Sequence, residues 1–176
     1  TMYKITANPR FAEILEKVAF NALPTQTTDD YMARQYFQQV NQIKSVKRPA
    51  NFDVNHSGLD ACFGLLTGYP CCTSNMHQGW PKFTQNLWYA TPDGGLAAVI
   101  YSPSRVNAKV ADGVDVTFVE DTKYPFEEKI SLKVESIARP ASFPLVVRIP
   151  EWSQATVICV NGDELEWEKD QNNLVK

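Results

Sequence analysis

The sequence predicts an α+β fold in which helices and strands are segregated, with a helical part over residues 1–92 and an antiparallel β-sandwich over residues 93–176. Two observations support this prediction. Apolar residues recur at helical spacing in the first part and alternate with polar residues in the second. Prolines lie at the ends of the alternating runs, as is typical of a sandwich built from short strands.

The composition excludes several classes of protein. Of the 176 residues, 44% are hydrophobic and 21% are charged, which is typical of a globular chain and not of a disordered one. Seventeen Lys and Arg against 20 Asp and Glu give a net charge of −3, without a basic block, so we expect no nucleic-acid partner. The longest apolar run, residues 96–101, is far shorter than the roughly 20 residues that cross a bilayer, so we expect no membrane span.

Residues 8–24 carry the signals of a helix. Asn8 suits the N-cap, Pro9 suits the first helical position, and Pro24 ends the pattern. One face is apolar and consists of Phe11, Ile14, Leu15, Val18 and Ala19. Residues 1–6 read as the end of another helix, and we therefore expect the chain to be a piece of a larger protein.

Residues 34–43 (RQYFQQVNQI) combine aromatic and amide side chains, and a strand of this sequence has no cleanly apolar face. Two interpretations stay open, a strand lining a polar cleft and a solvated edge strand. Residues 44–56 lack periodicity and predict a long loop.

A second helical pattern covers residues 75–90, where apolar residues again recur at helical spacing. Asn75 is a possible N-cap. Pro81 lies inside the pattern, so the helix either kinks there or begins after Asn75.

The second half of the chain predicts short strands. Their expected ranges are residues 96–102, 106–110, 114–120, 129–134, 145–149 and 155–160. Asn161-Gly162 suits a two-residue hairpin turn. Cys159 lies among aliphatic residues of the last strand, and we expect it to be an inert, buried thiol.

The candidate chemistry centres on residues 68–77 (GYPCCTSNMH). Cys71 and Cys72 are expected just before a helix, where the positive end of the helix dipole favours a thiolate. Both a zinc site and a nucleophile need a thiolate, but a structural role for the pair is equally open. His77 is a possible base, although a lone histidine at such a position is more often packed or solvated.

Several stretches, taken in order, resemble one family. They are PRFAEILEKVAFNALP, RQYFQQVNQI, FGLLTGYPCCTSNMHQGWPKFTQNLW, YPFEEKISLKV, FPLVVRIPEW and VICVNG. Together they resemble the β-L-arabinofuranosidase family, glycoside hydrolase family 127, over roughly residues 1–162. The most specific feature is the double cysteine followed by x-x-Asn.

The resemblance implies that residues 1–92 are the C-terminal part of an (α/α)6-barrel catalytic domain and that residues 93–176 are an incomplete β-sandwich domain. It implies a retaining glycosidase in which Cys71 is both the nucleophile and a zinc ligand, and Cys72 is a second zinc ligand. In the family, a further glutamate and cysteine complete the zinc site, and another glutamate is the general acid/base. All of these precede the equivalent of Thr1, so the resemblance also implies the remainder of the barrel upstream as a partner.

The resemblance further implies a carbohydrate substrate, an L-arabinofuranoside or a related plant cell-wall sugar. Thr73-Ser74 follow the cysteine pair where many relatives have two prolines, so the particular sugar stays open. Tyr36, Gln38 and Gln39 are candidates for lining the sugar cleft, because amides and aromatic faces suit hydroxyl groups and C–H faces. The alternative is a non-catalytic carbohydrate-binding or interaction module with structural cysteines.

Overall fold

The computed structural model describes residues 2–38, 62–65 and 70–176. It divides into two compact units, one formed by residues 1–16 with 84–176 and one formed by residues 17–83. We call the first the β unit and the second the helical unit, and each is described by itself. The predicted α+β class is confirmed, because the described helices precede residue 85 and the described strands begin at Trp88 or later.

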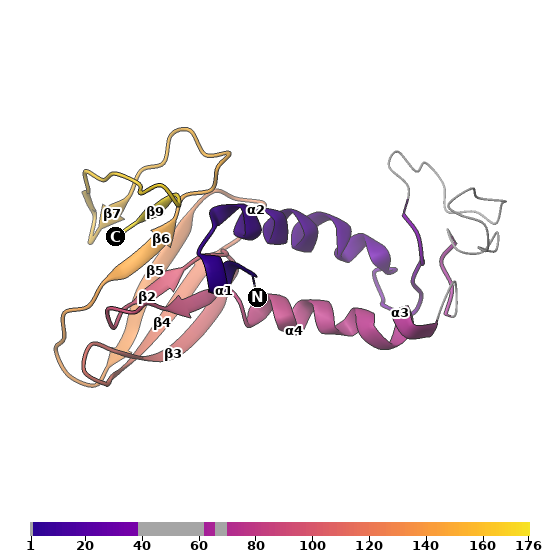
Figure 1. The fold of residues 1–176 in the computed structure, drawn as a ribbon, viewed down its shortest axis with the longest axis horizontal. Helices are drawn as coiled ribbons and strands as arrows, with labels where there is room; N and C mark the ends of the chain where they lie inside the picture. Colours follow the sequence, from indigo (N-terminus) through magenta and orange to yellow (C-terminus); the bar gives the residue numbers. More distant parts are fainter. Residues whose placement is uncertain (1, 39–61, 66–69) are drawn as a thin grey trace. The chain divides into compact units, whose positions relative to one another are not determined.

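The β unit contains nine described strands in three sheets (Figure 1). The four-stranded sheet has the order β1-β2-β6-β9, the three-stranded sheet has the order β3-β4-β5, and β7 and β8 form a separate ribbon. The strand bounds are Trp88–Ala90 (β1), Leu96–Ala98 (β2), Ser104–Val110 (β3), Val114–Thr122 (β4), Ile130–Ile137 (β5), Leu145–Arg148 (β6), Cys159–Val160 (β7), Asp163–Glu164 (β8) and Leu174–Val175 (β9).

One pairing corrects the expectation of antiparallel sheets. β2 and β6 are parallel, with Leu96 opposite Leu145, whereas the other described pairs are antiparallel. Parallel neighbours need a long crossover connection. Here the three strands of the β3-β4-β5 sheet provide that connection between β2 and β6, with no helix among them.

The apolar core of the β unit draws on both larger sheets. Inward positions alternate along β4, where Val114, Val116 and Phe118 are buried. They cluster with Leu96 of β2 and Val110 of β3. Further partly buried residues pack against this cluster, namely Trp88, Val106, Ala108, Ala141, Phe143 and Leu145.

The predicted first helix is confirmed. α1 spans Met2–Thr6 and α2 spans Pro9–Lys17, and the Asn8 side chain accepts a hydrogen bond of 3.0 Å from the backbone N–H of Arg10. In the helical unit the chain continues as a π-helical segment, η1 (Val18–Ala22), and a 3-10 turn, η2 (Pro24–Gln26).

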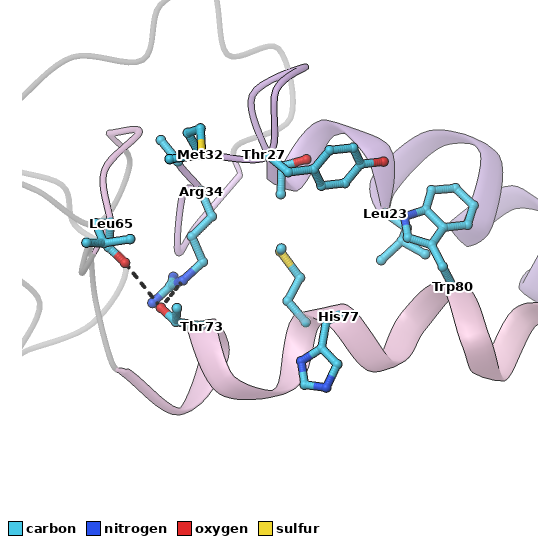
Figure 2. Close-up of a pocket in the computed structure, with 11 residues that line it drawn as sticks. Leu23, Thr27, Met32, Arg34, Leu65, Thr73, His77 and Trp80 are labelled. Atoms are coloured by element: carbon cyan, nitrogen blue, oxygen red, sulfur yellow. Dashed lines mark hydrogen bonds between the residues drawn. The ribbon is translucent and has the colours of Figure 1, made fainter.

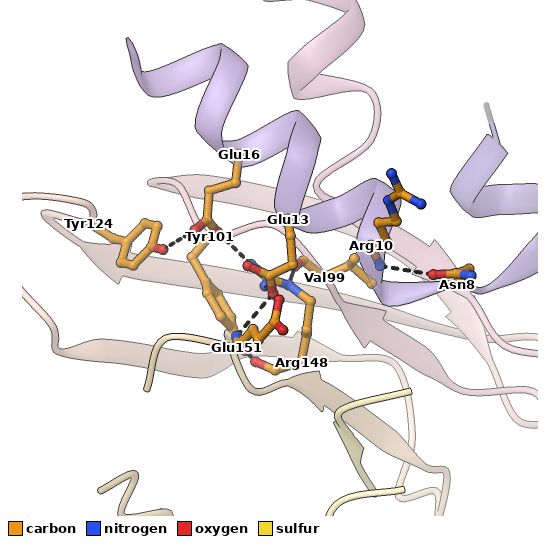
Figure 3. A network of polar contacts seen from close by, with 9 residues as sticks. All are labelled: Asn8, Arg10, Glu13, Glu16, Val99, Tyr101, Tyr124, Arg148 and Glu151. Carbon is orange, nitrogen blue, oxygen red and sulfur yellow. Dashed lines mark hydrogen bonds and ion pairs between the residues drawn. The ribbon is translucent and has the colours of Figure 1, made fainter. Parts of the chain in front are cut away.

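The buried face of α2 differs from the predicted one. Ile14 and Val18, assigned to the apolar face, are 45% and 48% exposed, whereas Glu13 and Glu16 are buried. Both carboxylates pair with Arg148 at the end of β6, which is fully buried (Figure 3). Charge pairing therefore decides which side of this helix faces the sheet.

Neutral groups complete the hydrogen bonding of this buried cluster, which we call the Arg148 cluster. The guanidinium of Arg148 also donates to the carbonyl of Val99, and the Tyr124 hydroxyl donates to Glu16. The backbone N–H of Glu151 donates to Glu13 at 3.1 Å. Buried charges are tolerated where such partners satisfy them.

The predicted helix over residues 75–90 is wrong at both ends. Helix begins earlier, as α3 (Pro70–Asn75), continues through a 3-10 turn, η3 (Met76–Gln78), and ends with α4 (Gly79–Thr84). Residues 88–90 form β1 instead, because they pair with β2. Pro81 is the third residue of α4, among the positions whose N–H has no intrahelical acceptor.

The hairpin at Asn161-Gly162 is confirmed. Both residues have positive φ angles, 55° and 99°, as a type I′ turn requires. The expected strand over residues 155–160 shortens to Cys159–Val160, and Cys159 is exposed rather than buried. The reason is that β7 and β8 form their own two-stranded sheet, which joins no other described strand.

None of the described helices is long and apolar enough to span a membrane.

Candidate functional site

The cysteine pair lies inside a helical turn rather than before it. Cys71 and Cys72 are the second and third residues of α3, and Cys71 is exposed while Cys72 is partly buried. Asn75 is the last residue of α3, and its side-chain amide donates to the carbonyl of Cys71 at 2.8 Å. Asn75 therefore supports the turn that carries the pair, and it stands at the N-cap of η3 without a side-chain capping hydrogen bond there.

The surroundings of Cys72 disfavour its thiolate. Burial raises the pKa of the Cys72 thiol above its usual value, and the neighbouring Cys71 side chain raises that pKa further. The charge of Arg34 and a hydrogen bond from Tyr36 act in the opposite direction but are smaller. Burial and the neighbouring thiol thus act against the effect expected from the helix start at Cys72.

The described residues supply only part of a zinc site. Zinc usually takes four ligands, and two adjacent thiols are donors of the right kind. Among the described residues, no group of three or more His, Cys, Asp and Glu side chains could hold a metal ion. Cys71 and Cys72 therefore fit two of the four ligand positions of a typical zinc site.

Arg34 anchors the neighbourhood of the pair. Its backbone bridges to Thr27 on one side and to Gly64 on the other. Its side chain is buried, and the Nε atom donates a hydrogen bond of 2.7 Å to the hydroxyl of Thr73 (Figure 2). Thr73 in turn donates to the carbonyl of Leu65 at 3.3 Å.

A pocket of about 320 Å³ lies in the helical unit, within the range of small-molecule sites. Its walls combine apolar and aromatic side chains with a few polar groups, including His77. The lining residues are Leu23, Thr27, Tyr31, Met32, Ala33, Arg34, Leu65, Thr73, Met76, His77 and Trp80. Aromatic faces with a few hydrogen-bonding groups suit a sugar-sized ligand, whose rings carry both C–H faces and hydroxyl groups.

The sequence-predicted sugar contacts are only partly described. Tyr36 hydrogen-bonds to Cys72, and the amide of Gln38 donates to the hydroxyl of Thr25. Gln39 lies outside the described residues. The substrate-binding role of all three stays a prediction. Over residues 34–38 the chain forms isolated bridges at Arg34 and no strand, and the rest of the predicted strand is not described.

Sequence reasoning missed Arg34 and Thr73 as parts of the site. Both stand next to recognised features, Arg34 at the start of the amide-rich stretch and Thr73 directly after the cysteine pair. Their hydrogen bond joins residues 39 positions apart. A single sequence holds no periodicity that links them, so the only available signal was the position of each residue beside a recognised feature, the amide-rich stretch for Arg34 and the cysteine pair for Thr73.

Comparison with known proteins now adds a family and a fold. Residues 95–176 match the family model described as "Beta-L-arabinofuranosidase, GH127 middle domain". A solved structure described as "Glycoside hydrolase" superimposes with a TM-score of 0.73 at 20% identity, over 99% of this chain and 27% of that chain. That likeness shows the fold, and this chain spans only 27% of the solved protein. No curated protein matches.

The resemblance seen in the sequence is thereby confirmed where the family model applies. The matched segment contains β2 to β9, including both strands of the Asn161-Gly162 hairpin and the Arg148 end of β6. Residues 95–176 of this chain are similar to the middle domain of the β-L-arabinofuranosidase family GH127, which is the family that the sequence resembles.

Proposed function

We propose that this chain is part of a retaining glycoside hydrolase that acts on L-arabinofuranosides or related plant cell-wall sugars, with Cys71 as its nucleophile. The observation that carries the proposal is the match of residues 95–176 to the GH127 middle domain. An exposed Cys71, in the same helical unit as a pocket for a small ligand, supports it.

The proposal includes a finer description of the fold. Residues 1–92 would be the end of an (α/α)6 catalytic barrel and residues 93–176 an incomplete β-sandwich. Two sheets that share one apolar core support the sandwich. The remainder of the barrel, upstream of Thr1, would supply the acid/base glutamate and the other zinc ligands.

The chemistry assigned to the chain's own residues is a double displacement. The Cys71 thiolate attacks the anomeric carbon, and the glycosidic C–O bond breaks while an upstream glutamic acid protonates the leaving oxygen. Water, deprotonated by the same glutamate, then attacks the anomeric carbon and the Cys71 thiolate leaves. A zinc ion bound by Cys71 and Cys72 would keep both thiols deprotonated near neutral pH.

The alternative function is a non-catalytic carbohydrate-binding or interaction module with structural cysteines. It predicts that Cys72 stays a protonated thiol, and burial and the neighbouring Cys71 side chain act in that direction by raising the pKa of the Cys72 thiol. The two proposals differ in what happens when each cysteine is replaced.

The test uses the complete protein that contains these residues, with an aryl β-L-arabinofuranoside as substrate. Cys71→Ser should abolish turnover even where zinc is retained, because a serine hydroxyl stays protonated near pH 7. Cys72→Ser should lower zinc occupancy and activity together, with partial recovery at high zinc concentration. Cys159→Ser is the matched control, because Cys159 is an exposed thiol of the β unit, and it should behave as wild type.

A mechanism-based inhibitor that reacts at the anomeric carbon should add its mass to the Cys71 peptide and leave Cys71→Ser unlabelled. Residues 1–176 alone should not hydrolyse the aryl β-L-arabinofuranoside, since the proposal places the acid/base and two zinc ligands upstream. If Cys71→Ser keeps most of the activity, the nucleophile is elsewhere and the structural role of the pair is favoured.

A further inference from the structure

Two hydrogen bonds near the cysteine pair, from Arg34 to Thr73 and from Thr73 to Leu65, have no part in the proposed chemistry. We propose that Arg34 is a positioning residue for Cys71 and Cys72, which acts by holding Thr73 and with it the first turn of α3. The inference deepens the proposed function, on which the catalytic importance of the pair rests.

The backbone of Arg34 is fixed before its side chain contributes anything. Arg34 and Gly64 exchange backbone hydrogen bonds of 3.2 and 2.9 Å, and Arg34 also bridges to Thr27. The adjacent Gln35 N–H donates to the carbonyl of Gln26 at 3.0 Å. Two extended segments thus hold Arg34 from both sides.

The side chain of Arg34 extends from this anchor to α3. Arg34 is only 4% exposed, and its Nε donates to the Thr73 hydroxyl at 2.7 Å (Figure 2). The same hydroxyl donates to the carbonyl of Leu65 at 3.3 Å. A charged donor shortens and strengthens such a bond, and a planar guanidinium gives it a direction. With its oxygen accepting one bond and its proton donating the other, Thr73 is held in a single orientation.

The orientation of Thr73 determines that of the pair. Thr73 directly follows Cys72 in α3, a helix of only six residues that ends in a 3-10 turn. These residues form the first turns of a helical run that continues through η3 into α4, and because terminal helical turns fray, tertiary contacts must hold the direction of their side chains. A displacement of about 1 Å at a reacting group can cost about a hundredfold in rate. Arg34 therefore acts on the reaction through Thr73.

The first arm of the test compares Thr73→Val with Thr73→Ser in the complete protein. Valine keeps the shape of threonine but removes the hydroxyl, and the charge of Arg34 is unchanged in both variants. For Thr73→Val we expect kcat per zinc-loaded molecule to fall by about tenfold to a hundredfold, with KM within about twofold of wild type. Thr73→Ser should recover most of kcat because its hydroxyl restores the hydrogen bonds with Arg34 and Leu65.

The second arm needs no hydrolysis. Iodoacetamide alkylation of the chelator-treated complete protein, followed by peptide mass spectrometry, gives the reaction rate of Cys72 relative to Cys71. Cys72 is partly buried and Cys71 is exposed, so the ratio should be low in wild type. It should rise severalfold in Thr73→Val, where the turn is released, and return to the wild-type ratio in Thr73→Ser.

A double variant checks that both residues act through one bond. Thr73→Val added to Arg34→Met should lower kcat no further than Arg34→Met alone, because Arg34→Met has already removed the hydrogen bond between Arg34 and Thr73. An unchanged alkylation ratio in Thr73→Val overturns the proposal, whatever happens to thermal stability, and so does an unchanged kcat in an active protein. If the wild-type protein hydrolyses no arabinofuranoside but the ratio still rises, the proposed function fails while the positioning role of Arg34 stands.

Discussion

Two arginines that are buried among the described residues, Arg34 and Arg148, have different neighbours. Arg148 in the β unit lies against the carboxylates of Glu13 and Glu16 from α2. Arg34 in the helical unit directs its Nε to the neutral hydroxyl of Thr73, next to the cysteine pair. The first guanidinium pairs with charges that belong to the fold, whereas the second supports a turn that carries reactive groups.

The comparison shows that burial alone does not tell what an arginine does. The partner determines how much unfolding free energy is lost when the arginine is replaced. A carboxylate left buried and unpaired costs far more than a hydroxyl that loses one donor. We therefore expect Arg148 substitutions to be visible in stability and Arg34 substitutions to be visible mainly at the cysteine pair. Three predictions test and extend this contrast within the two units.

The largest expected effect is that of Arg148→Met. It leaves Glu13 and Glu16 buried without their cation, so the β unit should lose about 3–5 kcal/mol of unfolding free energy. Hydrogen exchange of the β4 and β6 amides in the complete protein measures the loss. The control is Arg105→Met, which breaks an exposed pair with Glu135 at 2.7 Å and should cost less than about 1 kcal/mol. Equal losses in both variants would contradict the role of the Arg148 cluster.

The next largest expected effect is the pH dependence of stability caused by Glu120 on β4, a buried carboxyl whose hydrogen-bond donors carry no charge. The carboxyl is 2% exposed and accepts hydrogen bonds from the Ser102 N–H at 3.0 Å and the Ser104 hydroxyl at 3.1 Å. Burial raises its pKa from 4.5 to about 7. The folded protein thus binds this proton more tightly than the unfolded chain, so stability should be highest below pH 4.5 for this group and fall as the pH rises to about 7.

The size of that fall should be on the order of 3 kcal/mol. Glu120→Gln removes the titrating proton, so its unfolding free energy should change less between pH 5 and pH 8 than that of wild type. Urea unfolding or hydrogen exchange of β4 at both pH values measures the difference. A wild-type protein that gains stability between these pH values relative to Glu120→Gln would show that the sign is wrong.

The smallest expected effect is at Gln35, a buried amide in the helical unit. Its Nε2 donates to the carbonyl of Thr25 at 3.1 Å, and its Oε1 has no hydrogen-bond partner among the described residues. Gln35→Leu loses one bond but also removes a buried acceptor, so stability should change by less than about 1 kcal/mol. Hydrogen exchange of the backbone amides of residues 25–38 measures this change in stability. A loss above about 2 kcal/mol would mean that Oε1 is bonded by a group outside the described residues.

Local chemistry was enough to predict several elements. Asn8 and Pro9 fixed the start of α2 because capping needs only neighbouring residues. Asn161 and Gly162 fixed the hairpin because they tolerate positive φ. Residues 88–90 were missed because their helical spacing continued from α4, and only pairing with β2 makes them a strand.

Burial was harder to predict than secondary structure. Cys159 sits in an aliphatic sequence, yet its ribbon joins no other described strand and the thiol is exposed. Glu13 and Glu16 look like solvent-facing positions of α2, yet they are buried because Arg148 lies 135 and 132 residues further along the chain. Such pairings carry no local signal.

The sequence by itself determined the segregated α+β class, the start of α2, the Asn161-Gly162 turn, the family resemblance and Cys71-Cys72 as the place to look for chemistry. These follow from capping, φ preferences, apolar periodicity and residue identity, all of which act over a few positions. Only the tertiary structure decided that β2 and β6 run parallel, that α2 presents its glutamates to Arg148, and that Arg34 holds Thr73 beside the cysteine pair. Each of those contacts joins groups far apart in sequence, and its energy comes from burial and charge that exist only after the chain has folded.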